Sequence, residues 1–135
     1  MLLQLTGLEP IPCPRPRLSR FGVYYPATYR VWKRKADKVI RDVLARIPDH
    51  RPIDRPVSVT LLFVVRKPRR TRLLIPKPDI DNYMKAIFDA CNGLLWKDDT
   101  LVAHVQASKQ WADLVKPGIY MMVTDHNGNE PVPTA

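Results

Sequence analysis

The chain has 135 residues, enough for one ordinary domain, and 45% of them are hydrophobic, which excludes a wholly disordered protein. Lysine and arginine number 22 against 13 acidic residues, for a formal net charge of +9. This excess favours a polyanionic partner, with nucleic acid ahead of an anionic membrane surface, although a basic composition can also simply aid solubility.

The N-terminal half predicts a strand, a basic loop and a long helix. A short strand is expected over Leu2–Leu8. The stretch Pro10–Arg17 is rich in proline and arginine, and prolines lack a backbone donor and disfavour helix before them, so an extended loop is expected. Over Ala27–Ile47, apolar residues recur every three or four positions, which predicts an amphipathic helix with a basic outer face.

The middle of the chain predicts a buried strand followed by a second helix. Val57–Val65 is apolar on both faces, as expected for a central strand. It leads into Arg66–Arg72, a loop with five basic residues and no acid. A helix is expected over Asp81–Cys91, with Gly93 placed to end it.

Two further strands are expected, over Leu101–Trp111 and Gly118–Thr124, and the connection between them is short enough for an antiparallel hairpin. Residues 126–135 have no apolar period and are expected to form a flexible tail. The elements together predict a small single α/β domain, residues 1–125, with a mixed or largely antiparallel sheet flanked by two main helices.

The sequence gives little indication of secretion or of insertion into a membrane. Cys13 and Cys91 lack metal-ligand spacing and do not indicate a secreted disulfide framework. Residues 1–5 lack the charged and apolar segments of a signal peptide, and the longest apolar run, residues 61–65, is too short to cross a bilayer. A soluble, cytoplasmic protein without a membrane partner is therefore expected.

The most informative stretch is Lys77–Lys85, because two aspartates lie two positions apart where the chain enters the second helix. Pro78 favours an extended approach, in which Asp79 and Asp81 point the same way. Two converging carboxylates are costly unless a cation lies between them, and Mg²⁺ prefers such hard oxygen ligands. Helix capping explains one of the two aspartates equally well, so spacing alone leaves both interpretations open.

Three more acidic positions lie near this pair. Asp81, Lys85 and Asp89 share one helix face, which indicates either ion pairing along the helix or a lysine that faces a scissile phosphate. Asp98 and Asp99 lie in a turn, where aspartate is common. One of them completes a three-carboxylate site if the helix and the following strand pack side by side.

These residues together resemble the signature of RusA-type endonucleases. The matching motifs are Asp79-Ile80-Asp81-Asn82 at the start of a helix, Lys85 one turn later, Phe88-Asp89-Ala90, and Gly93-Leu94-Leu95-Trp96-Lys97-Asp98-Asp99. The likeness is strongest from Val57 to Val123, and the segment from Arg15 to Lys33 resembles phage-borne members. The resemblance implies a small α/β domain, a homodimer, and cleavage of four-way (Holliday) DNA junctions in recombination, repair or phage DNA processing.

The resemblance also assigns roles to residues. It implies that Asp79, Asp81 and Asp99 bind Mg²⁺, or Mn²⁺, that Lys85 is catalytic, and that Asn82, Asp89 and Asp98 support the site. It implies a bacterial cell or a phage-infected host as the setting. The expected DNA-binding residues are the cations of the loops and first helix: Arg15, Arg17, Arg20, Lys33, Arg34, Arg66, Lys67, Arg69, Arg70, Arg72 and Lys77.

Two other functions remain open from the sequence. A non-catalytic module that binds branched or single-stranded DNA would use the same basic surfaces. A metal-dependent hydrolase of nucleotides would use the same carboxylates, because such sites recur on many folds. The number of cations favours the larger substrate.

Overall fold

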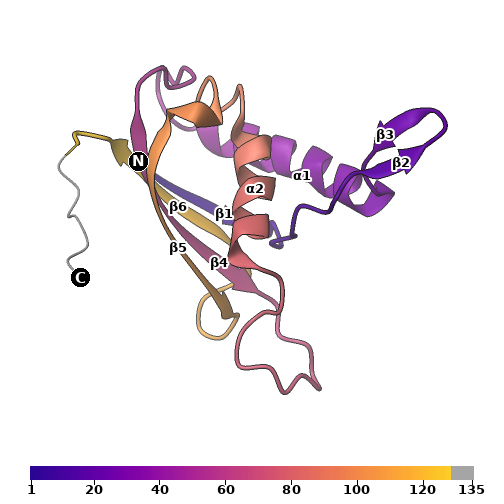
Figure 1. The fold of residues 1–135 in the computed structure, drawn as a ribbon. Coiled ribbons are helices and arrows are strands. Elements are labelled where there is room, and N and C mark those ends of the chain that lie inside the picture. Colours follow the sequence, from indigo (N-terminus) through magenta and orange to yellow (C-terminus); the bar gives the residue numbers. More distant parts are fainter. Residues whose placement is uncertain (129–135) are drawn as a thin grey trace, which may run out of the picture.

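A four-stranded mixed sheet organises the molecule in the computed structural model, which describes residues 1–128 (Figure 1). Its strand order is β1 (Leu2–Thr6), β6 (Gly118–Asp125), β4 (Val57–Val65) and β5 (Val102–Trp111). Strand β4 pairs in parallel with β5 and antiparallel with β6. The sheet therefore has a central apolar strand, as the sequence predicts for Val57–Val65.

Two helices, α1 (Ala27–Leu44) and α2 (Ile80–Cys91), pack on one face of the sheet (Figure 1). Alternate residues of β4 are buried beneath them, and Phe63 stacks on Tyr83 of α2 with ring centroids 5.3 Å apart. A short 3-10 helix, η1 (Asp99–Leu101), leads from α2 into β5. This two-layer arrangement confirms the predicted fold class.

The segment before α1 forms a second, separate sheet. Strands β2 (Arg17–Ser19) and β3 (Gly22–Tyr24) pair as an antiparallel hairpin, called the hairpin arm below (residues 17–24). Figure 1 shows it projecting from the body beyond the N-terminal end of α1. The sequence analysis expects only an extended loop at the start of this region and does not predict the arm.

The expected hairpin between the last two strands is wrong. Strands β5 and β6 lie on opposite sides of β4, so residues 112–117 cross the end of β4 instead of turning between neighbours. Strand β6 instead pairs with β1, and Gly118 allows this contact, since a Cβ there would lie 2.8 Å from the Leu5 carbonyl oxygen. The length of a connection does not reveal which strand lies between its ends.

Helix α1 begins where predicted but ends at Leu44, before the expected Ile47. The N–H groups of Arg46 and Ile47 donate to carbonyl oxygens three residues back, which tightens the last turn ahead of Pro48. The predicted tail, residues 126–135, lies outside the described residues from position 129 onward. His126 is held, because its N–H donates to the Pro56 carbonyl and its Nδ1 lies 3.0 Å from Ser58 Oγ.

Candidate active site

The chain enters α2 through an extended N-cap residue. Asp79 has φ −63° and ψ 140°, and its carbonyl oxygen accepts the N–H groups of Asn82 and Tyr83 at 3.1 and 3.4 Å. The Asp79 carboxylate makes no capping hydrogen bond, although the residue occupies the N-cap position. Capping therefore does not account for this side chain.

Asp79 and Asp81 lie on the wall of one groove of about 680 Å³. The opposite wall is the proline-rich segment 12–15, which is joined to α2 because the Cys13 N–H donates to the Asn82 carbonyl at 2.9 Å. Arg15 and Lys77 also line the groove. It thus combines two carboxylates with two cations, and we call it the Asp79–Asp81 groove. Its lining residues are Pro12, Cys13, Pro14, Arg15, Lys77, Pro78, Asp79, Asp81 and Asn82.

Neither carboxylate has a partner in the described part of the chain. No hydrogen bond or ion pair joins Asp79 or Asp81 to another described side chain. Lys85, one turn after Asp81 on the exposed face of α2, likewise forms no ion pair within residues 1–128 with Asp81 or Asp89. Ion pairing along the helix therefore does not explain this charged face.

Asp98 and Asp99 lie beside the other end of α2. A hydrogen bond from the Thr100 N–H, 3.1 Å long, lowers the pKa of Asp98. Burial raises the pKa of Asp99, and the carboxyl groups of Asp98 and Asp89 add to that rise. Asp99 therefore interacts electrostatically with Asp98 and Asp89, whereas it is not among the residues that line the groove of Asp79 and Asp81.

The turn that carries Asp98 is fastened to the segment after α1. The Ile53 N–H donates to the Leu95 carbonyl and the Lys97 N–H donates to the Ile53 carbonyl, each at 2.9 Å. Trp96, which is fully buried, packs edge-on against Phe88 with centroids 5.5 Å apart. The position of this acidic turn is thus set by the core.

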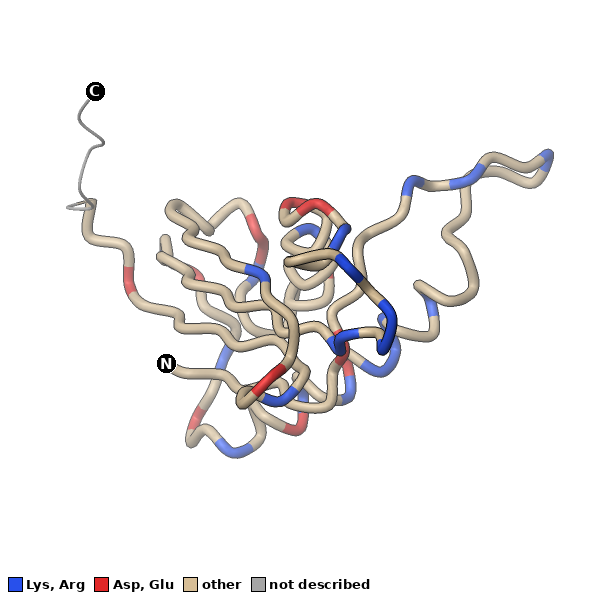
Figure 2. Tube along the Cα trace, turned by 90° about the horizontal axis from the view of Figure 1, so that it is seen from below, with Lys and Arg blue, Asp and Glu red and all other residues tan. Residues whose placement is uncertain are grey.

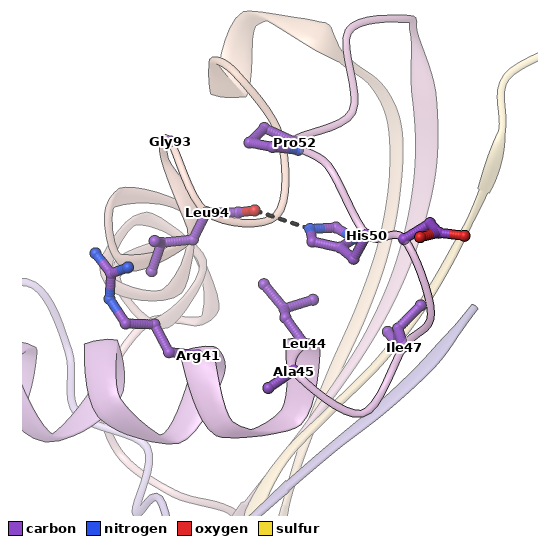
Figure 3. Close-up of a pocket in the computed structure, with 9 residues that line it drawn as sticks. Arg41, Leu44, Ala45, Ile47, His50, Pro52, Gly93 and Leu94 are labelled. Atoms are coloured by element: carbon purple, nitrogen blue, oxygen red, sulfur yellow. Dashed lines mark hydrogen bonds between the residues drawn. The ribbon is translucent and has the colours of Figure 1, made fainter.

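A second cavity, of about 480 Å³, lies between the end of α1 and the turn after α2 (Figure 3). His50 Nε2 lies 3.0 Å from the Leu94 carbonyl oxygen and links the two segments, and Leu44 and Pro52 supply apolar walls. None of the residues predicted for the active site lines this cavity. We therefore assign it to the scaffold that supports the turn.

The donor set of the Asp79–Asp81 groove fits a hard divalent cation. Among residues 1–128, no three His, Cys, Asp or Glu side chains are gathered into a metal cluster. Mg²⁺ does not require such a cluster, because proteins commonly hold it with one or two carboxylates plus water and substrate phosphate. The groove supplies two carboxylates that have no partner in the described part of the chain, together with cations able to hold phosphate, and so meets that requirement.

Three contacts that position the site are not foreseen from the sequence. Lys109 Nζ donates to the Pro78 carbonyl at 2.8 Å, and the Trp111 indole N–H donates to the Leu73 carbonyl at 2.9 Å. The carboxylate of Glu9 accepts the Arg66 N–H at 2.8 Å. Each joins residues 31 or more positions apart, so no local pattern reveals them.

A buried phenol from α1 also faces the site region. Burial raises the pKa of Tyr29, and Cys13 and Asp89 contribute to that rise. Its hydroxyl is therefore protonated at neutral pH. Tyr29 stacks on Trp32, whose indole N–H donates to the Glu9 carbonyl at 2.7 Å, so α1 is fixed against the start of the proline-rich segment.

The predicted DNA-binding cations are all exposed and fall into three groups. Arg15, Arg17 and Arg20 lie on the hairpin arm and its approach, and Lys33 and Arg34 lie on the outer face of α1. The remainder lie on the loop between β4 and α2, called the β4–α2 loop below (residues 66–78). Figure 2 shows lysine and arginine along the hairpin arm and the β4–α2 loop, which we call the two projections. The loop carries Arg66, Lys67, Arg69, Arg70, Arg72 and Lys77.

A small α/β domain with paired free carboxylates and flanking cations has the features of a nuclease. Residues 7–124 match the family model of the endodeoxyribonuclease RusA. YqaN, an uncharacterized protein of Bacillus subtilis (strain 168), is 30% identical over 112 residues, which cover 82% of this chain and 76% of that protein. The chain belongs to the RusA endodeoxyribonuclease family, which confirms the resemblance.

Family membership makes the protein an endodeoxyribonuclease, and RusA nucleases depend on metal ions. The predicted enzyme class is therefore confirmed. None of the helices described is long and apolar enough to cross a membrane.

Proposed function

We propose that the protein is a magnesium-dependent, structure-selective endonuclease that cleaves phosphodiester bonds in four-way DNA junctions. The observation that carries this proposal is the Asp79–Asp81 groove, where two carboxylates without partners among residues 1–128 lie beside Arg15 and Lys77. The two carboxylates would hold a hard divalent cation, and the two basic side chains offer contacts to phosphate. The family match supports the reaction class.

In this proposal Asp79 and Asp81 would hold Mg²⁺, or Mn²⁺ in its place, and Asp99 is the third ligand. The assignment of Asp99 rests on the resemblance to the family, since this carboxyl group lies with Asp89 and Asp98. A bound divalent ion polarises the phosphate and lowers the pKa of water. Lys85, exposed and without an ion-pair partner among the described residues, is proposed to stabilise charge at the phosphate.

The supporting residues act on these groups through position and charge. Asn82 fixes the proline-rich wall, because its carbonyl accepts the Cys13 N–H. Asp98 is anchored by the Thr100 N–H, and Asp89 lies on the α2 face that also carries Asp81 and Lys85. Their carboxylates keep the local potential negative, which favours a cation over bare phosphate.

The DNA is proposed to lie across the groove, with its arms contacted by the cations of the hairpin arm, α1 and the β4–α2 loop. Such phosphate contacts give affinity and salt dependence without reading base sequence. A homodimer is proposed, because paired cuts on opposing strands require two sites related by a two-fold axis. The proposed setting is the cytoplasm of a bacterial cell or of a phage-infected host.

The first experiment compares a labelled four-way junction with a linear duplex of the same sequence, with and without Mg²⁺. The variants are Asp79→Asn, Asp81→Asn and Asp99→Asn, beside Asp113→Asn, an exposed carboxylate on the 112–117 connection. We expect paired junction nicks that require Mg²⁺ and fall at least about a hundredfold in the three site variants. Asp113→Asn should cut like the wild type, and all variants should bind the junction in EDTA.

The other outcomes separate the alternatives. Equal cutting of junction and duplex would refute junction selectivity while leaving the nuclease. Tight binding with no cutting under Mg²⁺ or Mn²⁺ would identify a binding module. Hydrolysis of free nucleotides without DNA cleavage would identify the nucleotide hydrolase. An Asp99→Asn variant that cuts normally would remove Asp99 from the ligand set.

A further inference from the structure

The hairpin arm contributes nothing to the core of the described protein. All six residues of its strands are exposed, and its register pairs Arg17 with Tyr24 and Ser19 with Gly22. A two-stranded hairpin is only marginally stable in water unless it packs on something. A role for the arm therefore calls for a partner outside the body.

The tip of the arm is nevertheless built to hold one shape. Ser19 Oγ accepts the Phe21 N–H at 3.1 Å and donates to the Gly22 carbonyl at 3.2 Å. Gly22 has φ +118°, a value that side-chain-bearing residues rarely adopt. The turn thus presents Arg20 and Phe21 at the end of the arm, with the guanidinium carbon 5.1 Å from the ring centroid.

The exposed side chains of the arm are apolar or aromatic between arginines. Phe21 is 88% exposed, Leu18 81% and Val23 65%. Single apolar side chains on a surface are ordinary, but several on a projecting, cationic arm mark an interaction site. The arm lacks the apolar neighbours that would make it a core element.

Charge decides which partner fits. Residues 10–36 hold no acidic residue, and their seven cations are Arg15, Arg17, Arg20, Arg30, Lys33, Arg34 and Lys35. A second copy of a chain with net charge +9 would meet this surface with repulsion. Nucleic acid with unstacked bases offers both complements, since its phosphates attract arginine and its base faces stack on aromatic rings.

We propose that the hairpin arm inserts its tip at the open centre of branched DNA, where Phe21 stacks on an exposed base. Arg17 and Arg20 then contact the phosphates that flank that base. The proposal rests on the proposed function for its ligand, DNA with a branch point. The other proposed DNA contacts are to phosphates, so the stacked base would be an additional kind of contact. The arm, which lies outside the Asp79–Asp81 groove, would then favour branched DNA over duplex.

The test uses a four-way junction carrying 2-aminopurine at the branch point, a fully paired duplex of the same sequence, and the full chain in EDTA. The variants are Phe21→Ala, Phe21→Trp, which keeps a π-face, and Leu114→Ala, a control at a 96% exposed apolar residue on the 112–117 connection. Thermal melting of each variant checks folding. Affinity, 2-aminopurine fluorescence and sedimentation are measured at one salt concentration.

We expect Phe21→Ala to weaken junction binding at least about fivefold, the lower end of one base–aromatic stack. It should leave duplex binding within twofold and abolish the fluorescence change, while Phe21→Trp and Leu114→Ala behave like the wild type. Unchanged junction affinity and fluorescence in Phe21→Ala would overturn the proposal. A shift of that variant from dimer to monomer would also overturn it and make the tip a contact between copies.

Cleavage in Mg²⁺ is measured separately, so the two proposals fail separately. If the protein binds junctions through Phe21 but never cuts them, the proposal for the arm stands and the proposed function is refuted. A protein that cuts junctions, yet binds them equally well without the Phe21 ring, retains the function and loses the arm.

Discussion

Apolar side chains are buried in the body of the molecule, whereas several are exposed on its two projections. In the body, β4, α1 and α2 bury residues such as Phe63, Ile40 and Ile87 to 2% exposure or less. On the hairpin arm Phe21 is 88% exposed, and on the β4–α2 loop Leu74 is 93% exposed. Both projections are also rich in arginine.

The two projections differ from each other in how they are attached. The β4–α2 loop is tied to β5 by Lys109 and Trp111, and it leads directly into Asp79. The hairpin arm is held by the pairing of its own two strands and by hydrogen bonds within its own turn. The loop is therefore coupled to the position of Asp79 in the proposed active site, whereas the arm is proposed to be a separate contact to DNA. Three predictions test this division.

The largest effect concerns the two thiols. Burial raises the pKa of the Cys91 thiol to about 12, so in the folded protein little reactive thiolate is present near pH 8. Cys91 lies in the body, and its alkylation should require global unfolding, which slows it at least about a thousandfold relative to the denatured chain.

Cys13 provides the internal comparison, because it is also buried, at 7% exposure, but lines the Asp79–Asp81 groove at the base of the arm and outside α2. We expect iodoacetamide at pH 8, followed by peptide mass spectrometry, to label Cys13 well before Cys91. Labelling of Cys91 as fast as Cys13 would show that α2 opens locally, and the body would then not be the rigid support described.

The second prediction compares two phenylalanines. Phe63→Ala removes a fully buried ring that stacks on Tyr83, and should lower the free energy of unfolding by about 3–5 kcal/mol. Phe21→Ala should change it by less than about 0.5 kcal/mol. Urea unfolding followed by circular dichroism measures both. If Phe21→Ala lowered the free energy of unfolding by more than roughly 1.5 kcal/mol, the loss would be of the size seen for substitutions in a core. The arm would then be part of the body.

The smallest effect concerns the attachment of the β4–α2 loop. Lys109→Met removes the hydrogen bond to the Pro78 carbonyl and should slow junction cleavage roughly tenfold, because Asp79 follows directly and small misplacements are costly. Affinity for the junction in EDTA should stay within twofold of the wild type. Lys116→Met, an exposed lysine on the 112–117 connection, is the matched control. Equal losses in rate and affinity would instead make Lys109 a DNA contact.

Local patterns in the sequence predict the elements well. Strand β4 matches Val57–Val65 at both ends, because its length and its β-branched residues leave little ambiguity. Gly93 follows the end of α2 with φ +77°, as expected. Asp79 and Asp81 line one groove, although Asp81 lies inside α2 and not on the extended segment from which the sequence predicts a shared orientation.

The features that the sequence does not predict are long-range strand pairings and elements made of very short strands. The pairing of β6 with β1 and β4 depends on contacts across the whole chain, which a six-residue connection does not encode. The hairpin arm has strands of only three residues, and the prolines before it obscure its turn residues Ser19 and Gly22. The distance from Asp99 to the Asp79–Asp81 groove depends on how η1 packs on α2, which spacing does not specify.

Glu9 sets the spacing between the two projections. Its carboxylate binds the N–H of Arg66, where the β4–α2 loop starts, and its carbonyl binds the Trp32 indole on α1. The segment that leads to the hairpin arm begins at the next residue. Glu9 therefore fixes the distance between the points where the two projections leave the body. The distance that each projection extends from the body depends on the length of that projection. Insertions in either projection would alter how far it extends from the body without changing the distance between the points where the two projections leave it.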